Sequence, residues 1–196
     1  MKIYSWFLLL LLLRPAHPAV KIVWSEKRKL SISDFTIVDP RTYNSVYGAE
    51  CHHKITVAYE TDKDSITYHV SSVFDPQLSW MKYYQKRPLN AEQATLNQFQ
   101  ETRGLQHEQG HFDLGEMYAR KIRRLMSNYQ AMGSEERLAD SIACYLKEMV
   151  TTEQLYDRQT LHAQNVENQQ SWNRQILKML DSLAGYGKAN ATLSIR

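Results

Sequence analysis

The sequence predicts an α+β fold in which a small N-terminal antiparallel β-sheet packs against three long C-terminal helices. Two observations support this prediction. Residues 20–75 contain segments that alternate apolar and polar side chains, whereas residues 90–185 begin with a helix-capping pattern and are predicted to be mainly helical. With 196 residues, of which 43% are hydrophobic, the chain is long and apolar enough for one domain with a core. We therefore expect a single domain over residues 20–196.

The first 19 residues are typical of a secretory signal peptide. Lys2 precedes an apolar run from Trp6 to Leu13, and prolines and small residues follow up to Ala19. The run is too short to cross a bilayer. We expect a secreted or periplasmic protein without stable membrane insertion after cleavage; an uncleaved N-terminal anchor is the alternative.

Charge and cysteine content exclude several classes of protein. The chain has 24 Lys and Arg against 21 Asp and Glu, and loss of Lys2 and Arg14 with the signal peptide would leave 22 against 21. This near-neutral balance, without a basic stripe, predicts no nucleic-acid partner. Cys51 and Cys144 lack Cys-x-x-Cys spacing, which argues against a zinc ribbon. The sequence is compatible both with a disulfide between these two cysteines and with two free thiols.

Within the β region, a hairpin is the clearest element. Residues 53–60 (HKITVAYE) and Ser65 to Phe74 (SITYHVSSVF) alternate in hydrophobicity on either side of the turn-like segment TDKD. An earlier strand is predicted either at residues 20–24 or at residues 35–38. Pro76 is predicted to end the sheet region.

Three helices are predicted after residue 90. Asn90 and Gln93 form a capping-box pattern before a helix over residues 91–126. Gly133-Ser134 predicts a break and a second helix over residues 135–150. Thr151 or Thr152 would cap a third helix that reaches Leu183, and residues 184–196 are predicted to be a frayed tail. Three glycines weaken the first helix but permit close packing against a neighbour, namely Gly104, Gly110 and Gly115.

Two histidines of the first predicted helix form a candidate zinc site. His107 and His111 are four residues apart, so they project from one face of the helix and can hold one ion. Glu108 lies beside them in the H-E-x-x-H pattern of metallopeptidases, where it acts as the general base. Zn²⁺ in such a site activates water and polarises the scissile carbonyl. A pair of exposed helix histidines without a metal is the alternative.

A catalytic zinc normally has a third protein ligand. Glu116 is about 140° around the helix from His111 and points away. Glu136 begins a Glu-x-x-x-Asp pattern, which makes it one candidate. His162 is the other, because it lies on the predicted apolar face of the third helix, where an imidazole needs a partner or a metal. These residues alone leave both candidates open, and an ordinary core histidine is a third explanation for His162.

Several longer motifs resemble those of a known family. The segments HEQGHFDLGEMYAR, YDRQTLH and NQQSWNRQI, together with Ser79-Trp80, are similar to bacterial predicted secreted zinc-dependent proteases. The resemblance extends over most of the chain after residue 19, although SISDF near Ser31 departs from the family, which more often has Trp before Ser-Asp-Phe.

The resemblance implies that His107, His111 and His162 bind the zinc and that Glu108 is the base. Tyr156 and Asp157 then become candidates for stabilising an oxyanion and for orienting a ligating histidine.

Together these observations predict a secreted zinc metallopeptidase that cleaves a peptide or protein substrate. Two alternatives stay open: an exported binding or structural protein with an inert or absent zinc site, and a zinc amidase that acts on cell-wall peptides. The sequence specifies neither the cleavage preference nor the oligomeric state.

Overall fold

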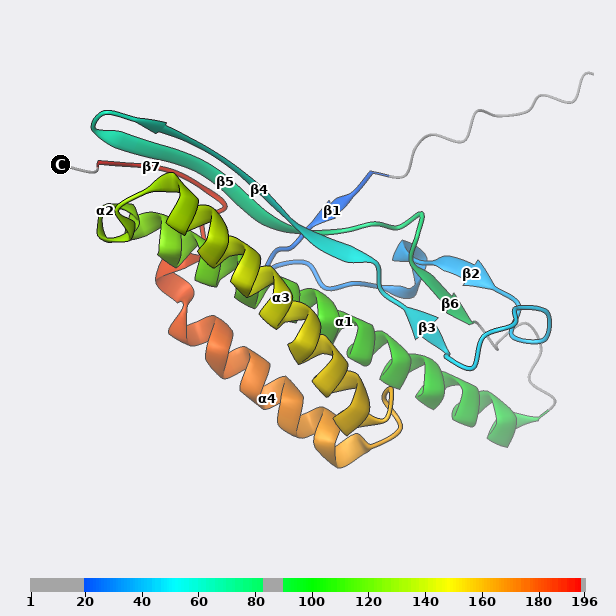
Figure 1. Cartoon of the computed structure of the whole chain (residues 1–196). Helices are drawn as coiled ribbons and strands as arrows, with labels where there is room; N and C mark the ends of the chain where they lie inside the picture. The colour runs from blue at the N-terminus through cyan, green and yellow to red at the C-terminus, as the bar shows by residue number, and fades with distance from the viewer. Residues whose placement is uncertain (1–19, 83–89, 195–196) are drawn as a thin grey trace, which may run out of the picture.

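The computed structural model describes residues 20–82 and 90–194 and confirms the α+β fold, with strands along one side of three long helices (Figure 1). The predicted signal peptide lies outside the described residues. Within the described ranges, no helix has the length and apolar character needed to cross a bilayer.

The larger sheet is built around the predicted hairpin, which is confirmed. Strands β4 (His53–Asp62) and β5 (Ser65–Phe74) are antiparallel, and His53 lies opposite Phe74. Strand β1 (Ile22–Val23) pairs with the end of β5. Strand β7 (Asn190–Ser194) pairs with its beginning, so the predicted frayed tail is wrong. The partly buried Ala191 and Leu193 of β7 pack against the core beneath the sheet, which explains why this segment is ordered.

A second, three-stranded sheet lies over the N-terminal half of the first long helix (Figure 1). Strand β2 (Thr36–Val38) runs parallel to β6 (Trp80–Lys82), and β3 (Ala49–Glu50) pairs antiparallel with β6. Both candidate early strands are therefore present, as β1 and β2. The prediction that Pro76 ends the sheet region is wrong, because β6 follows it and pairs with strands distant in sequence.

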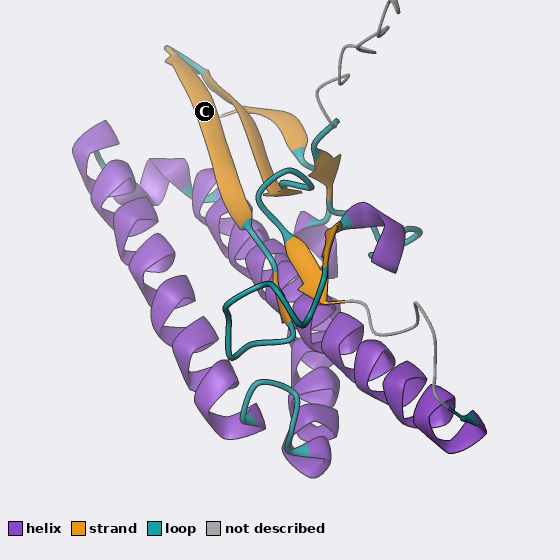
Figure 2. Ribbon diagram, turned by 90° about the vertical axis from the view of Figure 1, so that its right-hand side faces the viewer, coloured by secondary structure: helices purple, strands orange, loops and turns teal. Residues whose placement is uncertain are grey.

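The first long helix and the first break agree with the sequence prediction. Helix α1 spans Ala91–Ser127, and its N-terminal end projects beyond the strands (Figure 2). A short helix α2 (Tyr129–Met132) ends at Gly133, whose φ of 75° is the left-handed conformation that glycine favours. The Ser134 hydroxyl then accepts a hydrogen bond from the Arg137 amide and caps α3.

The second break is not where the sequence predicted it. Helix α3 spans Glu135–Thr160, and α4 follows at Val166–Ser182. Thr151 does not cap a helix, because its hydroxyl donates to the Lys147 carbonyl one turn earlier. The Asn165 side chain accepts from the Asn168 amide and is the cap of α4. Two 3₁₀ turns complete the elements, at Ile32–Asp34 and Ala184–Tyr186.

Helix α1 contacts both the strands and the other long helices, so its side chains form the centre of the molecule. One core cluster joins α1 to α3 and α4 and includes Met117, Tyr156 and Trp172. A second cluster joins α1 to the hairpin and includes Ile66 and Ile122.

A buried ion cluster on α1 also links these layers. The Glu116 carboxylate accepts from Arg120 Nε at 3.0 Å and from Arg123 Nη1 at 2.8 Å, and all three side chains are buried. Arg123 also donates to the Val70 carbonyl of β5, and Arg120 donates to the Leu180 carbonyl of α4. The two guanidinium groups therefore connect the sheet and α4 through one carboxylate.

We predict that Glu116→Gln lowers the free energy of unfolding by about 3–5 kcal/mol, because it removes the carboxylate that pairs with the buried Arg123 and leaves Arg120 with only the exposed Glu26. Urea denaturation followed by circular dichroism measures this loss. Arg41→Gln is the control, since the Arg41–Asp39 pair is exposed and its loss should leave the unfolding midpoint unchanged. Equal midpoints for Glu116→Gln and the unsubstituted protein would contradict the prediction.

Candidate metal centre

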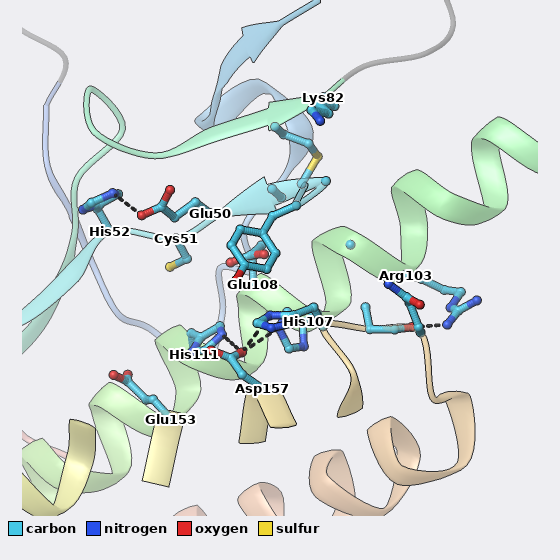
Figure 3. A pocket seen from close by; sticks show the side chains of 18 of the residues that line it. Glu50, Cys51, His52, Lys82, Arg103, His107, Glu108, His111, Glu153 and Asp157 are labelled. Carbon is cyan, nitrogen blue, oxygen red and sulfur yellow. Dashed lines mark hydrogen bonds and ion pairs between the residues drawn. The ribbon is translucent and has the colours of Figure 1, made fainter. Parts of the chain in front are cut away.

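A pocket of about 820 Å³ lies where β3 approaches the two helices α1 and α3. Residues of β3 line one wall, and residues of α1 and α3 line the opposite wall, with the turn after α3 at one end (Figure 3). His107, Glu108 and His111 all line this pocket. The structure thus brings the predicted motif to a cavity that a ligand can enter.

The two motif histidines converge on one carboxylate oxygen of α3. His107 Nε2 lies 3.0 Å from Asp157 Oδ1, and His111 Nε2 lies 2.9 Å from the same oxygen. Burial raises the pKa of Asp157, but the hydrogen bonds and charges of His107 and His111 outweigh this effect and lower it overall. Asp157 is therefore ionised between the two imidazoles.

The hydrogen bonds around His107 fix which ring nitrogen faces Asp157. Gln169 Nε2 donates to the Tyr156 hydroxyl at 2.6 Å and to Asn173, so Gln169 presents its oxygen to His107 Nδ1 at 3.1 Å. Nδ1 then carries a proton, so Nε2, the nitrogen that faces Asp157, is free to bind a cation when it is unprotonated and donates to Asp157 when it is protonated.

This arrangement fits a divalent cation. A lone pair on His107 Nε2 and a carboxylate oxygen both accept, so they attract each other only through a proton or a cation. The ligand atoms of His107, Asp157 and His162 lie within 4.8 Å of one another. Imidazole nitrogens with a carboxylate oxygen are ligands that zinc takes, and the bond from His107 Nδ1 to Gln169 is the outer contact that orients a ligating histidine.

The structure places His162 close to the centre but not on a helix. Its Nδ1 is 3.7 Å from Asp157 Oδ1, and its side chain is 43% exposed. The expectation that it lies on an apolar helix face is wrong, because α3 ends at Thr160. Leu161, His162 and Ala163 all have positive φ, a conformation that costs free energy in residues with side chains. The Tyr47 ring packs against His162 at 4.5 Å between centroids, and Arg103 donates to the Ala163 carbonyl.

Glu136 does not reach this pocket. It lies in the first turn of α3, and at about 1.5 Å per residue it is about 30 Å along the helix from Asp157. Glu116 also lies elsewhere, in the buried ion cluster described above.

Glu108 is buried at the floor of the pocket. Burial raises the pKa of its carboxyl group, while the charges of His111 and His107 and the Cys51 amide oppose this effect in part. A carboxylate with a raised pKa is a stronger base than an ordinary carboxylate, as a proton acceptor from water needs to be. Cys51 and Cys144 are both free thiols, and burial raises the pKa of Cys51 well above its usual value, so this thiol stays protonated.

Tyr156 has a different role from the predicted one. It is fully buried, and its hydroxyl donates to the His107 carbonyl at 3.0 Å while accepting from Gln169. Its ring stacks on the His107 ring at 4.6 Å. The expectation that Tyr156 stabilises an oxyanion is wrong, because its hydroxyl is committed to α1 and it does not line the pocket. Tyr156 positions His107.

Gly110, inside the H-E-x-x-H motif, makes this contact sterically feasible. A Cβ atom at Gly110 would lie 2.2 Å from the Tyr156 hydroxyl oxygen. The close packing expected of the glycines of α1 is therefore found at Gly110 and also at Gly115, where a Cβ would lie 2.6 Å from Ser72 Oγ, whereas a Cβ at Gly104 would meet nothing within 4 Å.

Gln169 is the site residue for which the sequence predicted no role. It lies in the segment NQQSWNRQI, which contributed only to the family resemblance. A polar residue on a buried helix face is a signal that a hydrogen-bond partner exists, but the sequence does not say that the partner is His107.

We predict opposite stability effects for two glycine substitutions on α1. Both Gly110→Ala and Gly104→Ala gain up to about 1 kcal/mol of helix propensity. Gly110→Ala also forces a methyl group against Tyr156, an overpacking that costs about 1–3 kcal/mol. Thermal unfolding should therefore show a lower midpoint for Gly110→Ala and an unchanged or higher midpoint for Gly104→Ala. Equal shifts would show that Tyr156 does not need the space above Gly110.

None of the protein-family models, curated proteins or solved structures compared with this chain matches it. The resemblance to the predicted secreted zinc-dependent proteases therefore rests on the sequence motifs alone, and membership of that family stays a prediction.

Proposed function

We propose that this protein is a zinc-dependent hydrolase that cleaves peptide bonds. The observation that supports this proposal best is the convergence of His107 Nε2 and His111 Nε2 on Asp157 Oδ1 inside a pocket that Glu108 also lines. In this proposal His107, His111 and Asp157 hold the zinc. His162 stays the alternative third ligand, as the sequence predicted. Export through the N-terminal segment also stays a prediction.

The side chains that line the pocket, and those directly behind it, have separate roles in the proposed reaction. Bound zinc would supply the positive charge that polarises a substrate carbonyl and activates water. Glu108 accepts a proton from the attacking water on its carboxylate and then delivers it to the leaving nitrogen. Tyr156 and Gln169 hold His107 in one orientation, so the ligand does not have to reorganise during the reaction.

The open pocket favours a hydrolase over a closed structural zinc site. A structural site usually surrounds the metal with four protein ligands, whereas this centre faces a cavity of about 820 Å³. A peptide or a cell-wall peptide can both offer an amide to such a cavity. The choice between peptidase and amidase is therefore left to the substrate experiment below.

We predict that Asp157 contributes more to zinc affinity than His162 does. Asp157→Asn keeps the size of the side chain but removes its charge, and we expect more than a 100-fold loss in zinc affinity, since loss of an outer-shell contact alone costs about 10–100-fold. His162→Ala should cost about tenfold or less. Competition with a fluorescent chelator measures both affinities, with inductively coupled plasma spectrometry to confirm about one zinc per chain.

The reverse order of losses would make His162 the third ligand and Asp157 its orienting partner. A chain that binds no zinc at neutral pH would contradict the zinc site altogether and favour a non-catalytic exported protein.

We predict that Glu108→Gln retains zinc but loses about 10²–10⁴-fold in hydrolysis rate, because the amide cannot accept the proton from water. The rate is measured with a quenched-fluorescence peptide library and with muropeptides in parallel, which separates peptidase from amidase. Glu92→Gln, an exposed change in the first turn of α1, is the control and should keep full activity. Activity of Glu108→Gln within a few fold of the control would show that Glu108 is not the base.

A further inference from the structure

Acidic and basic side chains both line the pocket, and Glu101 and Arg103 come from the same stretch of α1. In Figure 3, Glu50 and Glu153 lie to one side of the histidines and Asp157, whereas Lys82 and Arg103 lie to the other. The two basic groups have protein acceptors, since Lys82 donates to the Ser45 carbonyl and Arg103 to the Ala163 carbonyl. The pocket therefore has an acidic end next to the candidate metal centre.

Glu153 at this end contacts a histidine but no lysine or arginine. Its Oε1 lies 2.6 Å from His53 Nε2, and the His53 side chain is almost completely buried between β4 and α3. Across the described ranges, Glu153 forms no ion pair with a lysine or an arginine, and the same is true of Glu50.

The contact with His53 holds the Glu153 carboxylate at the pocket wall. His53 Nε2 faces Glu153 Oε1, whereas His53 Nδ1 is buried and faces away from the carboxylate. Glu153 also lines the pocket, so a ligand in the pocket can reach its carboxylate.

An exposed apolar side chain, Val150, lies in the pocket wall near the Glu153 carboxylate. Val150 lies one turn before Glu153 on α3, lines the same pocket and is 48% exposed. Asp157 follows Glu153 by one turn, so Val150, Glu153 and Asp157 lie on one face of α3. A lysine or arginine side chain combines an apolar stem with a cationic end, and this face of α3 offers both an apolar side chain and a carboxylate.

We propose that Glu153 determines substrate specificity by binding the cationic end of a lysine or arginine side chain of the substrate near the scissile bond. This inference rests on the proposed hydrolase function. His53 is a positioning residue that holds Glu153 against the pocket wall. The alternative is that the His53–Glu153 contact only joins the sheet to α3, in which case the charge of a ligand would not matter.

The test uses three dipeptide hydroxamates that differ in one side chain: lysine, N-acetyl-lysine and norleucine. Hydroxamates chelate zinc, so binding to the zinc-loaded protein is measured by calorimetry without any turnover. We expect the lysyl compound to bind about 10- to 100-fold more tightly than the other two, the range for one charge-assisted hydrogen bond. In Glu153→Gln the lysyl advantage should vanish while the norleucyl affinity stays unchanged.

Glu148→Gln is the matched control, because Glu148 is an exposed residue of α3 outside the pocket and should leave the lysyl advantage intact. If Glu153→Gln does not fold, the comparison of lysine with N-acetyl-lysine on the unsubstituted protein still shows whether the positive charge of the ligand side chain contributes to binding. Equal affinities for all three compounds would overturn the role of Glu153 but leave the hydrolase proposal standing. Failure of every hydroxamate to bind would overturn both proposals.

Discussion

The candidate metal centre depends on one contact, the hydrogen bond from the Tyr156 hydroxyl to the His107 carbonyl. This bond fixes the distance between α1 and α3 at the point where they cross, because the tyrosine ring lies against the backbone of Gly110. Asp157 is the next residue of α3, so the same crossing brings its carboxylate to His107 and His111. A wider crossing would separate the carboxylate from both imidazoles. Gly110 is therefore needed for the geometry of the site, although it has no side chain that could bind or react.

A third helix completes the restraint on His107. Gln169 of α4 bonds both Tyr156 and His107 Nδ1, so three helices determine the orientation of one imidazole. The buried Glu116 cluster, further along α1, joins the same helix to the sheet and to α4. Helix α1 is thus fixed at two separated places, and the ligand atoms lie on rigid elements. By contrast, His162 lies in the turn after α3 and its side chain is 43% exposed, so fewer neighbours restrain its imidazole.

The sequence correctly predicted the features that depend on residues close together in the chain. The hairpin, helix α1 and the pairing of His107 with His111 all follow from spacing within a few residues, and all are present. The features that were missed depend on contacts between distant segments. Strand β7 pairs with β5 across more than a hundred residues, and Thr151 continues α3 because the helix there is packed against α1. The hydroxyl of a tyrosine can stabilise an oxyanion, and the motif alone suggested this role for Tyr156. In the structure Tyr156 is buried against α4 and holds His107 instead, and a sequence motif does not show which residues are buried. Glu136 fits a known sequence pattern, but it lies in the first turn of α3, far along the helix from Asp157, and a pattern of spacing does not show this distance.

The spacing of α3 links metal binding to side-chain recognition. Asp157 and Glu153 are one helical turn apart, which separates their backbone atoms by about 6 Å along the axis. An extended peptide advances about 3.3 Å per residue, so one turn of helix matches one to two residues of substrate. In the proposed reaction, a carboxylate one turn from Asp157 would lie near a substrate side chain adjacent to the scissile bond. Because Asp157 and Glu153 belong to one helix, helix geometry would set the distance between the two binding groups, and not a flexible loop.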